Sequence, residues 1–255
     1  MRLDQYLVIN NYFESRNKAQ MAIENNSIMV NDKIINKSNY NVLDTDIIKI
    51  LDNTLKYVSR AGLKLEHAIK EFNLDLSNKV ILDIGASTGG FSDCSIQNGA
   101  KLVYAVDVGT NQLHEKLRNN PKIVSYENTN ILDFDITNLE KIDFIVMDVS
   151  FVSIEYLLPK INEFITDNNQ FICLIKPQFE VGKMKMKNGV VKDKSIHIQV
   201  INNVKEELNK YGLDIFKLVK SPILGQSGNT EFLALIKRGS NNNINVLKVV
   251  KWLNH

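Results

Sequence analysis

Four short apolar runs, each followed by a charged residue, constrain the fold of this chain more than any other feature. The runs span residues 80–82, 102–106, 144–147 and 171–175. The charges that follow them are Asp83, Asp107, Asp148 and Lys176. Helical segments lie between several of the runs, and continuous apolar strands joined by helical crossovers form a parallel sheet covered on both faces. Because the carboxyl ends of such strands line the ligand crevice, we expect the four charges to meet at one cleft. The alternative is that each charge begins a solvated loop.

The strand that ends at Asp83 leads into a glycine-rich loop that predicts a cofactor site. The loop reads Gly85-Ala86-Ser87-Thr88-Gly89-Gly90-Phe91, and its glycines allow a tight turn and a close approach to a ligand. Ser87 occupies the second glycine position of the dinucleotide fingerprint, and Asp83 would oppose a pyrophosphate, so a nicotinamide cofactor is disfavoured. S-adenosylmethionine carries an ammonium and a sulfonium and no phosphate, and it fits better. Asp107 lies 22 residues after Gly85, where an acid can accept both ribose hydroxyls.

The remaining polar candidates differ in how strongly their position marks them. Residues 128–131 follow a further predicted strand where the edge of an adenine ring would lie, and a plain turn explains them equally well. Lys176 ends the most apolar run, so we expect a partly desolvated ammonium that, with Asp148, could orient or deprotonate a hydroxyl. The alternative is a surface lysine that extends past the strand end into water. Lys64 and Glu231 would not be singled out by spacing alone.

The first fifty residues follow a different pattern and predict a separate small α+β unit. Leu3–Val8 has the spacing of a short amphipathic helix, and Ser15 suits the N-cap of a second helix. Ile28–Ile35 contains a hairpin signal, and Ile47–Ile50 reads as another strand. The expected parts are therefore residues 1–52, a linker at 53–58, a larger domain at 59–239 and a tail at 240–255.

Composition excludes several protein classes and leaves open whether the chain has a local basic face. No apolar run approaches the ~18–20 residues that span a bilayer. The N-terminus has an acid in its first turn and no long apolar stretch, so it does not resemble a signal peptide, and a cytoplasmic protein without membrane contact is expected. Two cysteines 79 residues apart and four scattered histidines predict neither a disulfide scaffold nor a metal site. The net charge is only +2, yet residues 176–194 carry six lysines against two acids. This run predicts a basic RNA rim beside the cleft and salt-sensitive binding, although a solvated loop is the alternative.

Five motifs carry a family resemblance. They are YVSRAGLKL (57–65), DIGASTGGFSD (83–93), DVSF (148–151), KPQFE (176–180) and SP…GN.E (221–231). In this order, over nearly the whole chain, they resemble the TlyA family of rRNA cytidine 2′-O-methyltransferases, historically also labelled hemolysin A. The resemblance implies an α/β fold, a Rossmann-like class I S-adenosylmethionine-dependent methyltransferase similar to the FtsJ type. It also implies that an S4-type RNA-binding domain precedes the methyltransferase domain.

The resemblance also assigns roles to individual residues. It implies a catalytic tetrad of Lys64, Asp148, Lys176 and Glu231, in which Lys176 activates the ribose 2′-hydroxyl. The expected cofactor-binding residues are Asp83, Gly85, Ala86, Ser87, Thr88, Gly89, Gly90, Phe91, Asp107, Val108, Asn130, Ile131 and Asp148. The expected RNA-binding residues are Arg2, Arg16, Lys18, Arg60, Lys183, Lys185 and Lys187.

The expected function is 2′-O-methylation of cytidine in ribosomal RNA, with S-adenosylmethionine as cofactor and ribosomal subunits as partners. The short N-terminus resembles the family subtype that modifies large-subunit rRNA only, whereas the tail after residue 239 departs from it, so small-subunit rRNA stays open. Two alternatives are a membrane-active hemolysin and a non-catalytic RNA-binding assembly factor. An intact tetrad and an intact glycine loop argue against the second alternative.

Overall fold

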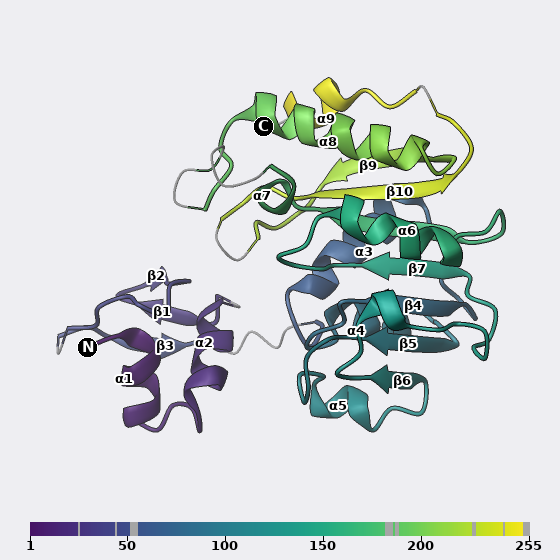
Figure 1. Cartoon of the computed structure of the whole chain (residues 1–255). Helices are drawn as coiled ribbons and strands as arrows, with labels where there is room; N and C mark the ends of the chain where they lie inside the picture. The colour runs from purple at the N-terminus through teal and green to yellow at the C-terminus, as the bar shows by residue number, and fades with distance from the viewer. Residues whose placement is uncertain are drawn as a thin grey trace. The chain divides into compact units, whose positions relative to one another are not determined.

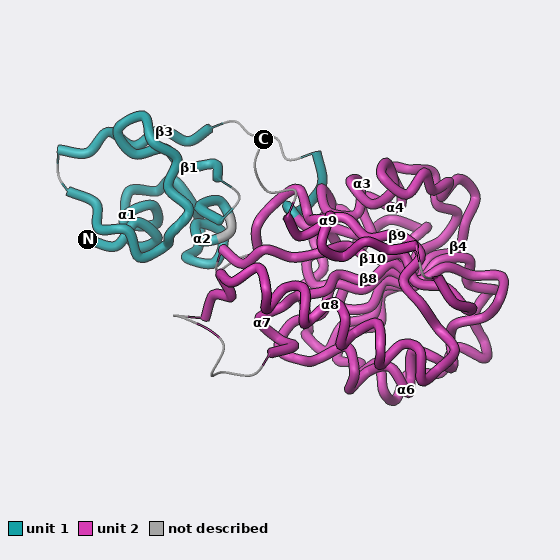
Figure 2. Tube along the Cα trace, turned by 90° about the horizontal axis from the view of Figure 1, so that it is seen from above, with its two compact units in different colours: residues 1–60 teal, residues 61–255 magenta. Residues whose placement is uncertain are grey.

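The chain divides into two compact units, Met1–Arg60 and Ala61–His255, which are coloured separately in Figure 2. The computed structural model describes residues 1–24, 26–43, 45–51, 56–181, 186, 189–225, 228–241 and 243–251. The expected linker at 53–58 lies next to the division between the units, and its residues 53–55 fall outside the described part.

Unit 1 is a small α+β unit built on a three-stranded antiparallel sheet. Its elements are α1 (Leu3–Ile9), α2 (Arg16–Glu24), β1 (Ile28–Val30), β2 (Lys33–Ile34) and β3 (Ile48–Ile50). The strand order is β2-β1-β3. Asn31 and Asp32 both have positive φ angles, 49° and 61°, which is the backbone of the two-residue turns that join twisted hairpin strands. The helices and the sheet enclose a core that contains Leu3, Leu7, Ala19, Ile23, Ile28, Val30 and Val42.

Unit 2 is built around a seven-stranded sheet in the order β6-β5-β4-β7-β8-β10-β9 (Figure 1). The strands are β4 (Val80–Ile84), β5 (Leu102–Val106), β6 (Ile123–Tyr126), β7 (Phe144–Met147), β8 (Gln170–Ile175), β9 (Leu213–Lys220) and β10 (Phe232–Arg238). The four apolar runs of the sequence form β4, β5, β7 and β8, which are neighbours and run parallel. The expected convergence of their carboxyl ends at one edge is therefore confirmed.

Helices cover both faces of this sheet. They are α3 (Ala61–Phe72), α4 (Gly90–Gln97), α5 (Glu115–Arg118), the 3₁₀ helix η1 (Ile131–Asp133), α6 (Ile154–Phe164), α7 (Pro177–Glu180), α8 (Lys194–Asn209) and α9 (Val246–Lys251). Buried residues of α6, α8 and α9 share one core cluster with alternate strand residues such as Leu82 and Ile84. α3 packs against α4 and contributes no residue to that cluster, so it covers the opposite face. The tail joins unit 2 through Val246 and Val250 of α9.

The expectation of a wholly parallel sheet is wrong at one edge. β10 pairs antiparallel with both β8 and β9. β9 and β10 are consecutive strands joined by the segment 221–231 without an intervening helix, so the chain reverses direction as in a hairpin. The sheet is therefore mixed, and the first residue of β10, Phe232, lies opposite Ile175 at the carboxyl end of β8.

Among the described residues, no helix has the length and apolarity that a membrane crossing needs. Cys94 and Cys173 are both buried and unpaired with each other. The described part of the chain contains no group of three or more His, Cys, Asp or Glu side chains arranged to hold a metal ion.

Candidate active site

Four charged side chains from four different elements form one continuous series of ion pairs. Lys176 Nζ lies 2.5 Å from Asp148 Oδ1, and Lys64 Nζ lies 3.3 Å from Asp148 Oδ2. Lys64 Nζ also lies 2.8 Å from Glu231 Oε2. Asp148 follows β7, Lys176 follows β8, Lys64 belongs to α3, and Glu231 precedes β10. We call the series Lys176–Asp148–Lys64–Glu231 the charge chain. The structure thus brings together all four residues of the expected tetrad.

The charges of this series stabilise one another inside the protein. All four side chains are at most 13% exposed, so their mutual attraction is weakly screened by water. Burial alone would raise the pKa of Asp148, but the ammonium groups of Lys64 and Lys176 outweigh it and lower that pKa below its usual value. Burial would likewise lower the pKa of Lys64, yet Asp148 and Glu231 raise it. Asp148 and Lys64 are therefore both charged at neutral pH.

Two polar residues that the sequence did not assign extend the charge chain at its ends. Lys176 Nζ donates a hydrogen bond of 2.9 Å to Ser150 Oγ. At the other end, Gln178 Nε2 donates one of 3.2 Å to Glu231 Oε1. Ser150 and Gln178 each lie two residues after a tetrad member, within the DVSF and KPQFE motifs, and that spacing is the signal that could have found them.

An exposed aromatic ring lies beside the lysine end of the charge chain. Phe151 is 91% exposed, and its ring centroid is 5.1 Å from that of Phe179. The Phe179 ring in turn lies 5.8 Å from Lys176 Nζ. Phe151 has a φ angle of 67°, a conformation that is strained for a bulky residue and that persists where the surroundings hold it. An open aromatic face next to a cation is a surface on which nucleic-acid bases stack.

The glycine-rich loop begins directly beside the charge chain. Gly85 has a φ angle of 79°, and a Cβ atom added there would lie only 2.9 Å from the Asp148 carbonyl oxygen. Only glycine allows this approach, which places the loop against Asp148. Asp107 fixes the loop from the other side, since its two carboxylate oxygens accept hydrogen bonds from Ser87 N at 2.8 Å and Gly109 N at 2.7 Å.

Asp83 provides the test of whether this loop suits S-adenosylmethionine. Its side chain is fully buried, and Oδ2 accepts a hydrogen bond of 2.6 Å from Ser92 Oγ, whereas Oδ1 has no partner among the described residues. Burial raises the pKa of Asp83 to about 7, and the negative charges of Asp148 and Asp107 act in the same direction. A cationic ligand in the adjoining loop would relieve this excess of acid, so the residues fit an ammonium or sulfonium compound.

The other expected cofactor residues lie along the same edge of the sheet. Val108, directly after Asp107, is 68% exposed. Asn130 caps η1 by accepting a hydrogen bond from Leu132 N, and Ile131 is buried beneath it. Ala86, Thr88 and Gly89 connect β4 to α4, Gly90 and Phe91 begin α4, and all five are buried or half-buried.

Most expected RNA-binding residues of unit 1 are already engaged within the protein. Arg2 Nε lies 3.0 Å and Arg16 Nε 2.9 Å from the carboxylate of Asp4, whose side chain is fully buried. Hydrogen bonding by Arg2 lowers the pKa of Asp4 far below its usual value, and Arg16 adds to this effect. Both arginine side chains remain nearly half exposed, so each has surface left for a phosphate.

The remaining basic candidates differ in their surroundings. Lys18 pairs with Glu14 on the surface of unit 1. Arg60 donates a hydrogen bond of 2.8 Å to the carbonyl oxygen of Glu24. Lys183, Lys185 and Lys187 lie outside the described residues.

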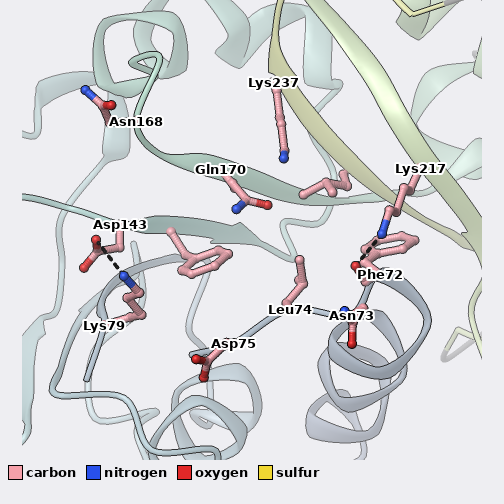
Figure 3. A pocket seen from close by; sticks show the side chains of 12 residues that line it. Phe72, Asn73, Leu74, Asp75, Lys79, Asp143, Asn168, Gln170, Lys217 and Lys237 are labelled. Carbon is pink, nitrogen blue, oxygen red and sulfur yellow. Dashed lines mark hydrogen bonds and ion pairs between the residues drawn. The ribbon is translucent and has the colours of Figure 1, made fainter. Parts of the chain in front are cut away.

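A cavity of about 340 Å³ opens at the opposite edge of the sheet (Figure 3). It is lined at the amino ends of the strands by Lys79 and Asp143, whose ion pair measures 3.7 Å, and by Gln170 of β8. Lys217 donates a hydrogen bond to the carbonyl oxygen of Phe72 at the end of α3. Ligands of open α/β sheets bind at the carboxyl ends of the strands, whereas this cavity lies at the amino ends. It is therefore separate from the candidate active site.

Comparisons with known proteins agree with the geometry. Residues 57–238 match the family model of the FtsJ-like methyltransferases, and residues 1–48 match that of the S4 domain. The chain is 43% identical to hemolysin A of Brachyspira hyodysenteriae, over 92% of this chain and 98% of that protein. It is 38% identical to the 23S rRNA (cytidine-2′-O)-methyltransferase TlyA of Campylobacter jejuni, over 86% and 92% of the two chains. A solved structure of a candidate hemolysin from Streptococcus thermophilus superposes with a TM-score of 0.77 at 38% identity, covering 98% and 94%.

Proposed function

Because this chain belongs to the TlyA/hemolysin A family, whose members join an S4 domain to an FtsJ-like methyltransferase domain, we propose that it methylates the 2′-hydroxyl of a cytidine in ribosomal RNA. The observation that carries the proposal is the close approach of Gly85 to the Asp148 carbonyl. This contact puts the glycine-rich loop beside the charge chain at one edge of the sheet.

In the proposed reaction the ribose oxygen attacks a methyl group in line with its leaving group. S-adenosylmethionine supplies that methyl on a positively charged sulfur, so the O–CH₃ bond forms as the S–CH₃ bond breaks. Asp83 and Asp107 would hold the cationic and ribose parts of this cofactor. Lys176, which must first release its own proton to water, would then orient the hydroxyl and receive its proton, as Asp148 holds the lysine in place.

The mouth of the site suits a single nucleotide of RNA. The 2′-hydroxyl would approach Lys176 from the side of Ser150, which is exposed and already provides a hydroxyl at hydrogen-bond distance. The exposed ring of Phe151 would support the base of the same nucleotide by stacking. Base stacking and the lysine together would position the ribose, and much of the rate would come from that positioning.

The test combines methyl transfer with a matched pair of lysine variants. Isolated 50S and 30S ribosomal subunits are incubated with labelled S-adenosylmethionine, and the modified nucleotide is mapped. Lys176→Met should bind S-adenosylmethionine normally and lose incorporation at least about 100-fold, as expected when a positioned acid–base group is removed. Lys237→Met, which changes a lysine at the opposite edge of the sheet, should retain it. No incorporation into either subunit, or full activity of Lys176→Met, would refute the proposal. Lysis of red cells by the purified protein would instead favour the hemolysin alternative.

A further inference from the structure

Glu180 is a half-buried residue outside the charge chain. Its carboxylate joins the segment after β8, which carries Lys176, to the segment after β7, which carries Asp148. Glu180 ends α7, and its Oε1 accepts a hydrogen bond of 3.0 Å from the backbone N–H of Ile154, the first residue of α6. The loop 148–153, between β7 and α6, carries Asp148, Ser150 and Phe151. Its beginning is held by the hydrogen bond from Asp148 N to the carbonyl oxygen of Ile84. Glu180 therefore holds the other end of a loop whose middle contains the reactive contacts.

Resting on the proposed function, we propose that Glu180 is a positioning residue for methyl transfer. Its carboxylate holds the end of the loop 148–153, and so keeps Asp148 and Ser150 within reach of Lys176. The loop requires such a restraint, since Phe151 occupies a strained backbone conformation that a free loop would leave. Within the described part of the chain, no hydrogen bond or ion pair joins Glu180 to Lys176 itself, so Glu180 acts through the loop and not on the substrate.

The surroundings of Glu180 make this restraint depend on pH. Burial raises the pKa of Glu180 to about 7, and the neighbouring charge of Glu155 on α6 adds to the rise, against the Ile154 N–H. The Cys173 thiol of β8 lies near it, and burial raises the pKa of that thiol, so it is uncharged. α8 also packs against α7, but its His197, whose pKa is lowered by burial, forms its hydrogen bond with the carbonyl oxygen of Val191. Around neutral pH, Glu180 is therefore divided between its two forms.

The hydrogen bond from Ile154 N–H to Glu180 is strongest when the Glu180 carboxylate is ionised. A carboxylate accepts a charge-assisted hydrogen bond and is favoured at a helix N-terminus, whereas a protonated carboxyl loses both advantages. The folded protein, however, favours the protonated form, because the pKa of Glu180 is raised above its ordinary value. The stability contribution of this group is thus present at low pH and lost as the pH rises through about 7. An ionised Glu180 at pH 8 opposes folding, which distinguishes a role in activity from a role in stability.

Glu180→Gln is the variant that separates the two roles, since the amide mimics the protonated carboxyl. We expect kcat at pH 8 to fall about five- to tenfold, as expected when a charge-assisted hydrogen bond becomes a neutral one. The ratio of wild-type to Glu180→Gln kcat should rise with a midpoint near pH 7, because other titrating groups cancel in this ratio. The Kd for S-adenosylmethionine should stay unchanged, and Tm at pH 8 should be equal or higher. Glu155→Gln is the matched control, and its kcat at pH 8 should equal that of the wild type.

A second measurement is independent of RNA and of catalysis. The amide resonance of Ile154 should titrate with a midpoint near pH 7 in the wild type, at a lower pH in Glu155→Gln, which lacks the charge that adds to the rise, and not at all in Glu180→Gln. If the wild type transfers no methyl while Ile154 titrates as expected, the proposed function fails and the loop restraint stands. An Ile154 resonance that titrates identically in Glu180→Gln overturns the inference. So does a variant with wild-type kcat at every pH, or one that loses activity together with Tm and cofactor binding.

Discussion

Asp148 contacts both lysines of the charge chain, so its replacement gives the sharpest test of how the positive and negative charges of this series balance. The four side chains carry two positive and two negative charges, and Asp148 contacts both lysines. Asp148→Asn leaves two buried ammonium groups with Glu231 as the one carboxylate of the series. Removing one partner of a buried ion pair costs about 3–5 kcal/mol, which for a unit the size of residues 61–255 lowers Tm by about 7–12 °C.

A second substitution should recover part of this loss. Asp148→Asn combined with Lys176→Met leaves only the ion pair of Lys64 and Glu231, whose opposite charges cancel. Lys64 Nζ and Glu231 Oε2 lie 2.8 Å apart. The double variant should therefore melt higher than Asp148→Asn, by about 5 °C if roughly 2 kcal/mol is regained. Both variants should lack methyl transfer, so stability and activity separate.

Thermal unfolding at several pH values is the assay for these variants. The surface pair of Lys160 and Glu163 provides the control, because Glu163 is 60% exposed and Glu163→Gln should cost less than about 1 kcal/mol. Since the pKa of Asp148 is lowered in the folded protein, its stabilising effect is present above its ordinary value and is lost as the pH falls through the folded value. The difference between wild type and Asp148→Asn should therefore shrink toward pH 3. A double variant that melts below Asp148→Asn would refute the charge-balance argument.

Two further substitutions test the packing around the site and the core of unit 1. A Cβ atom at Gly225 would lie 2.3 Å from Glu231 Oε1, so Gly225→Ala should displace the flexible carboxylate and reduce methyl transfer at least about tenfold, as when a catalytic group is misplaced, with a smaller fall in Tm than Asp148→Asn causes. Wild-type activity in Gly225→Ala would show that Glu231 need not remain at Lys64. Asp4→Asn should destabilise unit 1 by about 2–3 kcal/mol, because a buried carboxylate that binds half-exposed arginines loses its charge. Hydrogen exchange should increase in residues 1–51 and stay unchanged in unit 2, and uniform protection across both would contradict this explanation.

The strand-end half of the site could be predicted from sequence because it depends on local rules. Continuous apolar runs become parallel buried strands, and parallel strands bring the residues that follow them to one edge. This rule places Asp148 and Lys176 together without knowledge of any contact between them. The role proposed for Glu180 could not be predicted from the sequence. It depends on a hydrogen bond from the backbone N–H of Ile154, and a backbone donor leaves no signature in the sequence.

Glu231 shows why the other half could not be derived in the same way. Glu231 comes at the amino end of its strand, so in a wholly parallel sheet it would lie at the edge opposite Lys176. β10 instead pairs antiparallel with β8, and Phe232 stands opposite Ile175. Because β10 runs antiparallel, Glu231 lies at the edge formed by the carboxyl ends of the parallel strands, where Lys64 of α3 binds it. With Asp148 alone, two buried ammonium groups would share one carboxylate, so the antiparallel strand supplies the charge that makes the cluster neutral.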